Sequence, residues 1–260
     1  MFFDGIDKKE PIHSFLMIGQ SNMAGRGELT DLPEISDPRL KVFRNGRWQP
    51  MYRPVNADRP FAGINLAERF AQLYAETYDV EVGLICCADG GTTLEQWKPG
   101  SLLFDNAVNC AKLAQRTSTI AGVLWHQGEG DCIPEWYSTY AKRFEVMRAA
   151  FRKELDLYDV PFLVGALGDF LKDREVSPQL VNYTHINAQL QLAAASDPLT
   201  GYVSAEGLDH KGDNLHFSAK SLFTFGERYF DLFQQLRDPN KMFEEKPNPD
   251  QAIRTGMEWM

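Results

Sequence analysis

The chain has 260 residues, of which 43% are hydrophobic and 24% are charged, a composition that excludes a largely disordered protein. Its net charge of −9 repels phosphate backbones and anionic lipid surfaces, so we expect neither nucleic acid nor a membrane as partner. The first residues lack a basic segment followed by an apolar one, and no apolar run approaches about 18 residues. We therefore expect a cytoplasmic protein, or a secreted one if a leader has been removed. The length fits one α/β domain over residues 1–260.

Short apolar runs typical of buried strands recur along the chain, at residues 13–19, 82–88, 120–126, 161–167 and 201–205. Between and after them, apolar residues return every three or four positions, as in helices with one buried face, at residues 65–78, 101–117, 138–156, 182–195 and 219–237. Such alternation indicates βαβ units, whose strands form a parallel sheet covered by helices. The sequence thus predicts an α/β fold, a three-layer α/β/α sandwich with a parallel, flavodoxin-like central sheet.

Residues 28–64 interrupt this alternation with five prolines and little periodicity. Within this segment, Asn45 and Gly46 provide the two positive-φ positions of a type I′ turn, which predicts a hairpin. We expect the 28–64 excursion to pack beside the ligand crevice. The tail, residues 238–260, is polar and contains proline, and we expect it to lie along the surface or to fray.

The four cysteines do not suggest a disulfide framework or a zinc site. Cys86 and Cys87 are adjacent in an apolar run, where neighbouring side chains of a strand point to opposite faces. The chain also contains no pair of cysteines separated by two residues, the spacing common among zinc ligands. We expect no metal.

Chemically useful residues follow the predicted strands, at the edge of a parallel sheet where ligands bind. Ser21 follows the first strand, although a serine or Asn22 there could merely cap a helix. Met23 stands where the nucleophile elbow G-x-S-x-G would have its second glycine, which argues against an ordinary α/β-hydrolase. After the second strand, Gly90 and Gly91 allow a main-chain N–H to approach a ligand closely, or simply form a turn.

Two further strand ends carry polar clusters. Gln127 and Glu129 follow the third strand; the amide could stabilise an oxyanion and the carboxylate could orient an imidazole. Near the C-terminus, Asp213 and His216 are three residues apart, close enough for a carboxylate to contact one ring nitrogen while the other faces away. Alone, each cluster is equally consistent with a polar surface.

Together the four clusters resemble a known family. GQSNM at 19–23, DGGT at 89–92, HQGE at 126–129 and DNLH at 213–216 are similar, in this order, to the sequence blocks of SGNH-type esterases. The similarity is greatest to carbohydrate esterase family six and the sialate O-acetylesterases, and it covers residues 13–230 or so.

The resemblance implies a role for each cluster. Ser21 would be the nucleophile, His216 the general base and then acid, and Asp213 the carboxylate that orients it, with Glu129 as an alternative or auxiliary partner. The oxyanion hole would consist of the Ser21 N–H, the Gly90 N–H (or that of Gly91) and the Gln127 side chain. Residues expected to line the crevice, unless they merely pack or lie on the surface, are Arg26, Trp48, Trp97 and His126.

The predicted protein is therefore a serine esterase that removes O-acetyl groups from a carbohydrate such as acetylxylan or an O-acetyl sialic acid, without a cofactor. A short-chain lipase or thioesterase on the same scaffold is one alternative, and a non-catalytic carbohydrate-binding protein is another. The sequence does not predict the oligomeric state.

Overall fold

The computed structural model describes residues 11–236, which fold around a seven-stranded sheet. The tail predicted at residues 238–260 lies outside the described residues. The strands are β1 (Ile12–Gly19), β2 (Leu40–Arg44), β3 (Arg47–Pro50), β4 (Val82–Cys86), β5 (Ser118–His126), β6 (Phe162–Gly165) and β7 (Thr200–Val203). The order across the sheet is β3-β2-β4-β1-β5-β6-β7, and every neighbouring pair is parallel except the β2–β3 hairpin.

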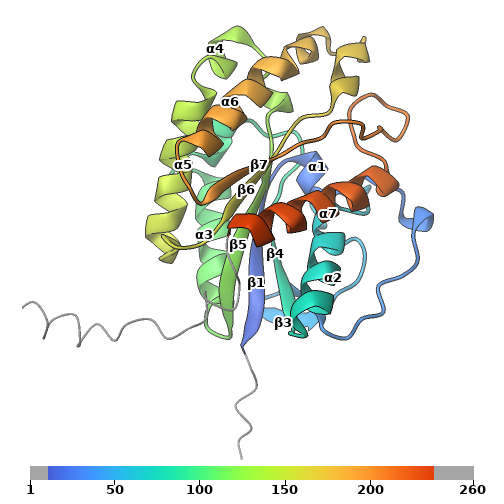
Figure 1. The fold of residues 1–260 in the computed structure, drawn as a ribbon, viewed down its shortest axis with the longest axis vertical. Helices are drawn as coiled ribbons and strands as arrows, with labels where there is room; N and C mark the ends of the chain where they lie inside the picture. The colour runs from blue at the N-terminus through green and yellow to red at the C-terminus, as the bar shows by residue number, and fades with distance from the viewer. Residues whose placement is uncertain (1–10, 237–260) are drawn as a thin grey trace, which may run out of the picture.

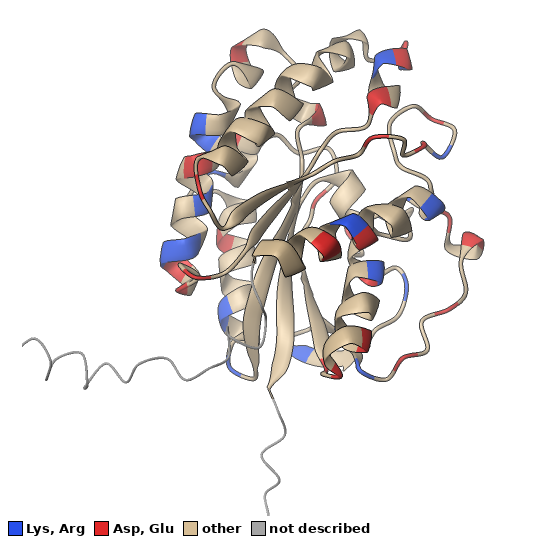
Figure 2. Cartoon of the chain, viewed as in Figure 1, with Lys and Arg blue, Asp and Glu red and all other residues tan. Residues whose placement is uncertain are grey.

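The five predicted strands are all present, and their order is that of the predicted flavodoxin-like sheet. Counted along the chain without the hairpin, β4-β1-β5-β6-β7 is the 2-1-3-4-5 order of that fold. Among the strands that the structure describes, these five contain no Lys, Arg, Asp or Glu, and Figure 2 shows the charges on the helices and loops around them. Burial on both faces explains this, because a charge inside either layer would lose its hydration.

Helices cover both faces of the sheet (Figure 1). The α-helices are α1 (Ser21–Ala24), α2 (Leu66–Tyr78), α3 (Leu102–Ala114), α4 (Pro134–Tyr137), α5 (Tyr140–Leu155), α6 (Tyr183–Ala195) and α7 (Ala219–Leu236). Short 3₁₀ turns are η1 (Leu29–Asp31), η2 (Leu94–Trp97), η3 (Glu129–Asp131), η4 (Asp169–Asp173) and η5 (Pro178–Asn182). The pair α2 and α7 covers one face, and α3, α5 and α6 cover the other, which confirms the three layers.

Aromatic side chains on the central strands hold the layers together. Phe15 of β1 is fully buried and packs edge-to-face on Phe70 of α2 and Phe233 of α7. Trp125 of β5 points to the other layer, where it contacts Phe144 of α5. Because β1 lies between β4 and β5 at the centre of the sheet, the residues that follow it emerge in the middle of one sheet edge.

The 28–64 segment contains the expected hairpin, with Asn45 at φ 52° and Gly46 at φ 72° between β2 and β3. However, β2 pairs with β4 in parallel and thereby extends the central sheet. The later part of the segment, residues 56–59, reaches the loop after β4. This reach brings one part of the excursion to the crevice, as expected.

Two further properties bear on the sequence predictions. All four cysteines carry free thiols in the described part of the chain. No helix within residues 11–236 is both long and apolar enough to cross a membrane.

Candidate active site

Ser21 lies where the central strand β1 ends. Gly19 closes the strand at φ 129°, and a Cβ on it would come within 2.2 Å of the His126 carbonyl oxygen, so the close approach of β5 requires glycine here. The Gln20 N–H donates to that carbonyl at 2.8 Å, and Ser21 begins the single turn α1. Gln20 occupies the N-cap position, so Ser21 is not the cap of this helix. Its hydroxyl is therefore available to other partners.

His216 contacts Ser21 across 195 residues of chain. The Ser21 Oγ and the His216 Nε2 are 3.1 Å apart, and the His216 Nδ1 lies 2.6 Å from Asp213 Oδ2. Asp213 Oδ1 also accepts from the backbone N–H groups of Leu215 and His216, at 3.0 and 2.8 Å. Asn214 between them has φ 52°, and this left-handed residue allows the loop to turn tightly enough for these contacts. The structure thus brings together the three residues expected to act as nucleophile, base and orienting carboxylate.

Burial and hydrogen bonding set the protonation of the row formed by Asp213, His216 and Ser21. Burial lowers the pKa of His216 below its usual range, an effect that the hydrogen bond and charge of Asp213 only partly offset. Burial also tends to raise the pKa of Asp213, but the hydrogen bonds from His216 and Leu215 outweigh it and hold that pKa below its usual range. Because an ionised carboxylate only accepts, the His216 Nδ1 carries the proton and the Nε2 lone pair accepts from the Ser21 hydroxyl. The imidazole is therefore arranged to act as a base.

Asn22 ties the serine loop to the histidine loop, a role that the sequence reasoning missed because it treated Asn22 only as a helix cap. Its amide nitrogen donates to Glu129 Oε1 at 2.7 Å and to the Leu215 carbonyl at 3.1 Å. Its amide oxygen accepts from the Phe217 N–H at 3.1 Å. The signal in the sequence was its place in the block GQSNM. These contacts flank His216 on both sides and fix its distance from Ser21.

Glu129 lies near the row of three residues and bonds Asn22 rather than His216. It is buried, accepts from Asn22, and lies 4.0 Å from the His126 Nδ1. Its charge raises the pKa of His216 through space, against the larger effect of burial. Of the two carboxylates considered as partners of His216, Asp213 therefore contacts the imidazole, whereas Glu129 contacts Asn22.

Gly90 is the glycine beside Ser21. A Cβ added to Gly90 would lie 3.4 Å from the Ser21 Cβ, whereas one added to Gly91 meets no described atom within 4 Å. The Gly90 N–H, one of the expected oxyanion donors, donates to Asp58 Oδ2 at 2.9 Å. Asp58 in turn forms a buried two-fold ion pair with Arg26, at 2.7 and 3.0 Å. Asp58 carried no signal in the sequence, because it lies in the irregular 28–64 segment.

The Gln127 side chain is not directed at Ser21 but holds neighbouring loops together. Its amide nitrogen lies 2.8 Å from Asp131 Oδ2, 3.0 Å from the Thr92 carbonyl and 3.2 Å from Gln20 Oε1, and its oxygen accepts from the Tyr140 hydroxyl at 2.9 Å. An amide nitrogen has two hydrogens, and three acceptors already surround this one. A role as an oxyanion donor would therefore require these contacts to rearrange.

The four residues expected to line the crevice do not form its exposed wall, which corrects that expectation. Trp97 and His126 are fully buried; Trp97 donates to Thr92, and the His126 Nε2 bonds the Ala166 carbonyl. Trp48 packs on Gly83, at the opposite end of the sheet from Ser21. Arg26 lies beside Gly90, but it is buried against Asp58. Trp97, His126 and Arg26 instead pack inward and cover the core at this sheet edge.

A hydroxyl, an imidazole and a carboxylate in hydrogen-bonded sequence at the carboxyl edge of a parallel sheet are the arrangement of a serine hydrolase. The flavodoxin-like strand order, with these residues on the blocks at 19–23 and 213–216, is that of the SGNH type. The family described as carbohydrate esterase, sialic acid-specific acetylesterase, matches residues 11–235, and the chain belongs to this family. It is thus a carboxylic ester hydrolase of the carbohydrate acetylesterases.

Individual relatives agree with this assignment. A probable carbohydrate esterase of Arabidopsis thaliana is 28% identical over 255 residues, which span 85% of this chain and 92% of that protein. An X-ray structure from the same plant has a TM-score of 0.78 at 22% identity and covers 87% of this chain and 99% of its own. NanS has a TM-score of 0.72 at 17% identity, with coverage of 88% and 98%. At these identities the two structures show a shared fold.

Proposed function

We propose that Ser21 is the nucleophile with which this esterase removes acetyl groups from a carbohydrate, with His216 as base and Asp213 as its orienting partner. The observation that carries the proposal is the unbroken row of contacts from Asp213 Oδ2 through the imidazole to the Ser21 Oγ, at 2.6 and 3.1 Å. Ser21 is 195 residues from His216 in the chain, and such distant groups rarely join a row of this kind unless they act together.

The reaction follows from the protonation of this row. As the Ser21 Oγ attacks the acetyl carbonyl carbon, the His216 Nε2 takes the hydroxyl proton, and the Asp213 carboxylate stabilises the imidazolium. The tetrahedral intermediate collapses when His216 passes that proton to the oxygen of the sugar, which leaves as an alcohol. Water then attacks the acetyl-serine with the same base, and acetate leaves as Ser21 regains its proton.

The developing oxyanion needs donors close to Ser21. The Ser21 N–H lies in the first turn of α1, where helix N–H groups have no carbonyl four residues earlier to bond. We assign this N–H as the first donor. Gly90 is the second candidate, because of its place beside Ser21. For its N–H to serve, the oxyanion must replace Asp58 Oδ2 as the acceptor.

Replacing the nucleophile tests the proposal directly. Ser21→Ala should lower kcat for p-nitrophenyl acetate by about 10⁶-fold, as in other serine hydrolases. The hydroxyl is small and lies at the edge of the core, so the thermal unfolding midpoint should stay within a few degrees of the parent. A fluorophosphonate probe should label the parent and leave the variant unlabelled. A variant that hydrolyses the ester as fast as the parent would refute the assignment.

A series of p-nitrophenyl esters with longer acyl chains separates a deacetylase from a lipase on the same scaffold. We expect kcat/KM to fall steadily from acetate to octanoate. A rise with chain length would instead indicate an acyl pocket for lipids.

A further inference from the structure

A cavity of about 370 Å³ has in its wall Gly90, the glycine beside Ser21. Its walls come from the loop after β4, from Arg59 of the 28–64 excursion, and from the start of α3; they include Arg59, Gly90, Gly91, Gln96, Ser101 and Leu102. None of these side chains takes part in the row formed by Asp213, His216 and Ser21. The cavity therefore needs an explanation of its own.

Gly90 connects the cavity with the serine. An added Cβ on Gly90 would lie 3.4 Å from the Ser21 Cβ, and the Gly90 carbonyl accepts at 3.0 Å from Nη2 of Arg59, which lines the cavity. Space above Gly91 is open, because a Cβ there meets no described atom within 4 Å. For a sugar to occupy the cavity while its acetyl group lies at Ser21, it must therefore extend past Gly90 and Gly91.

The polar groups of the cavity are suited to hydroxyls. Arg59 is 40% exposed and is held in place by Asp89 Oδ1 at 2.7 Å and by the Asp58 and Gly90 carbonyls. A guanidinium has five N–H groups, so these contacts leave donors for a ligand. Leu102 at the rim is 83% exposed and offers an apolar surface. Few polar groups beside apolar surface are typical of sites for small organic ligands.

The cations next to this cavity are already neutralised. Arg59 pairs with Asp89, and Arg26 pairs with Asp58. An anionic ligand would have to compete with these carboxylates, in a protein whose net charge is −9. Sialic acid, the sugar in the description of the family, carries a carboxylate, whereas a neutral sugar needs only hydrogen bonds.

We infer that this cavity binds the sugar part of the substrate and that the preferred sugar is neutral rather than acidic. Its hydroxyls bond Arg59, while the acetyl group lies at Ser21. The inference rests on the proposed function of Ser21. It also assigns Arg59 and Asp89 as residues that determine specificity, since releasing Arg59 from Asp89 would create an unpaired cation for an acidic sugar.

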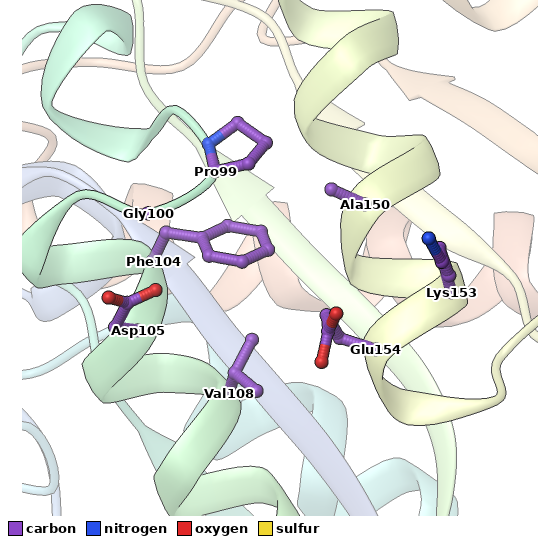
Figure 3. Close-up of a pocket in the computed structure, with 8 residues that line it drawn as sticks. All are labelled: Pro99, Gly100, Phe104, Asp105, Val108, Ala150, Lys153 and Glu154. Atoms are coloured by element: carbon purple, nitrogen blue, oxygen red, sulfur yellow. The ribbon is translucent and has the colours of Figure 1, made fainter.

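A second cavity provides a matched control. It also measures about 370 Å³, and it lies between α3 and α5, where Figure 3 shows Phe104 and Val108 facing Ala150, Lys153 and Glu154. Lys153 is exposed, as a surface cation should be. Lys153→Gln removes one positive charge from a cavity that has no part in the proposed chemistry.

Steady-state kinetics with two substrates, an acetylated xylo-oligosaccharide and an O-acetylated N-acetylneuraminic acid, test the inference. We expect the parent to have at least about a 10-fold higher kcat/KM for the neutral substrate, and Arg59→Gln to raise its KM by about 10-fold, the effect of one lost hydrogen bond from a charged group. Asp89→Asn should improve kcat/KM for the acidic sugar several-fold. Lys153→Gln should leave both substrates unaffected.

A filling substitution supplies a second approach that removes no hydrogen bond. Leu102→Trp adds bulk to the cavity at an exposed position, and it should raise the KM for the oligosaccharide more than the KM for the smaller p-nitrophenyl acetate. A parent that prefers the acidic sugar, or Arg59 and Leu102 variants that behave like Lys153→Gln, would overturn the inference. Ser21→Ala separates failure of this inference from failure of the proposed function. Loss of p-nitrophenyl acetate hydrolysis in that variant depends on the nucleophile and not on the cavity.

Discussion

The two sides of Ser21 use their polar groups in different ways. On the His216 side, Asp213, the imidazole and the serine hydroxyl contact one another in order, and Asn22 secures both neighbours of His216. On the Gly90 side, the expected donors have other acceptors: Asp58 takes the Gly90 N–H. The proton-transfer half of the site is thus complete without substrate, whereas the oxyanion half still has an internal carboxylate in contact with one donor.

This difference has a physical basis. A proton relay requires fixed partners at hydrogen-bond distance, and burial strengthens such contacts once all of them are satisfied. A donor for a transient oxyanion must instead be able to change its acceptor, since its hydrogen bond should be strongest when negative charge develops on the substrate. In the absence of substrate, a buried N–H that has no acceptor is costly, and Asp58 removes that cost at Gly90.

After Ser21→Ala, the largest expected effect tests whether the His216 side is complete. Asp213→Asn should lower kcat by about 10⁴-fold, because an amide no longer favours the tautomer with the proton on Nδ1 or stabilises the imidazolium. Glu129→Gln should cost only about tenfold, roughly 1.4 kcal/mol of barrier, because Glu129 bonds Asn22, which in turn bonds the two neighbours of His216 and not the imidazole. Single-turnover kinetics with p-nitrophenyl acetate measure both. Equal losses would identify Glu129 as the working partner of His216.

A smaller effect tests Gln127, whose side chain was expected among the oxyanion donors. An oxyanion donor removed by Gln127→Ala would cost about 10² to 10³ in kcat. The contacts of this amide with Asp131, Thr92 and Tyr140 predict a different result, a loss of about 1 to 3 kcal/mol in the free energy of unfolding with less than about tenfold in kcat. Urea unfolding and kinetics on the same preparation decide between them. Unchanged stability with a 10²-fold slower enzyme would restore Gln127 to the oxyanion hole.

The smallest effect is a shift in the pH profile. Only neutral His216 can accept the serine proton, so kcat/KM should rise with pH through the pKa of His216 and then level off. Burial places this pKa below the usual value of about 6.5, so the midpoint of the acid limb should lie below about pH 6.5. Asp213 raises the pKa of His216, so Asp213→Asn should move the acid limb of the residual activity to still lower pH. A limb at or above pH 7 in the parent would show that the imidazole is not buried as described.

Local patterns in the sequence were sufficient for the framework. Five strands and five long helices lie within a few residues of their predicted positions, and the turn at Asn45–Gly46 has the predicted positive φ angles. Periodicity and turn chemistry depend on near neighbours in the chain, which is why they can be read directly. The four motif blocks also located Ser21, Gly90, Asp213 and His216, because strand order in such a fold brings the carboxyl ends together.

The remaining features depend on contacts between segments that no local pattern connects. Nothing in the 28–64 segment predicts that β2 joins the sheet or that Asp58 reaches the Gly90 N–H. The inward packing of Trp97 and His126 depends likewise on neighbours from other segments: Trp125 of β5 for Trp97, and Phe217 and Phe225 for His126.

Local sequence was enough for the kind of fold, for the strand ends that carry polar groups, and for the serine and the histidine that meet there. Tertiary structure decided which carboxylate touches His216, which glycine lies beside Ser21, and whether each expected donor is free. The reason is that side-chain pairing is set by distances of a few ångströms between distant segments, and these distances follow from packing of the whole core.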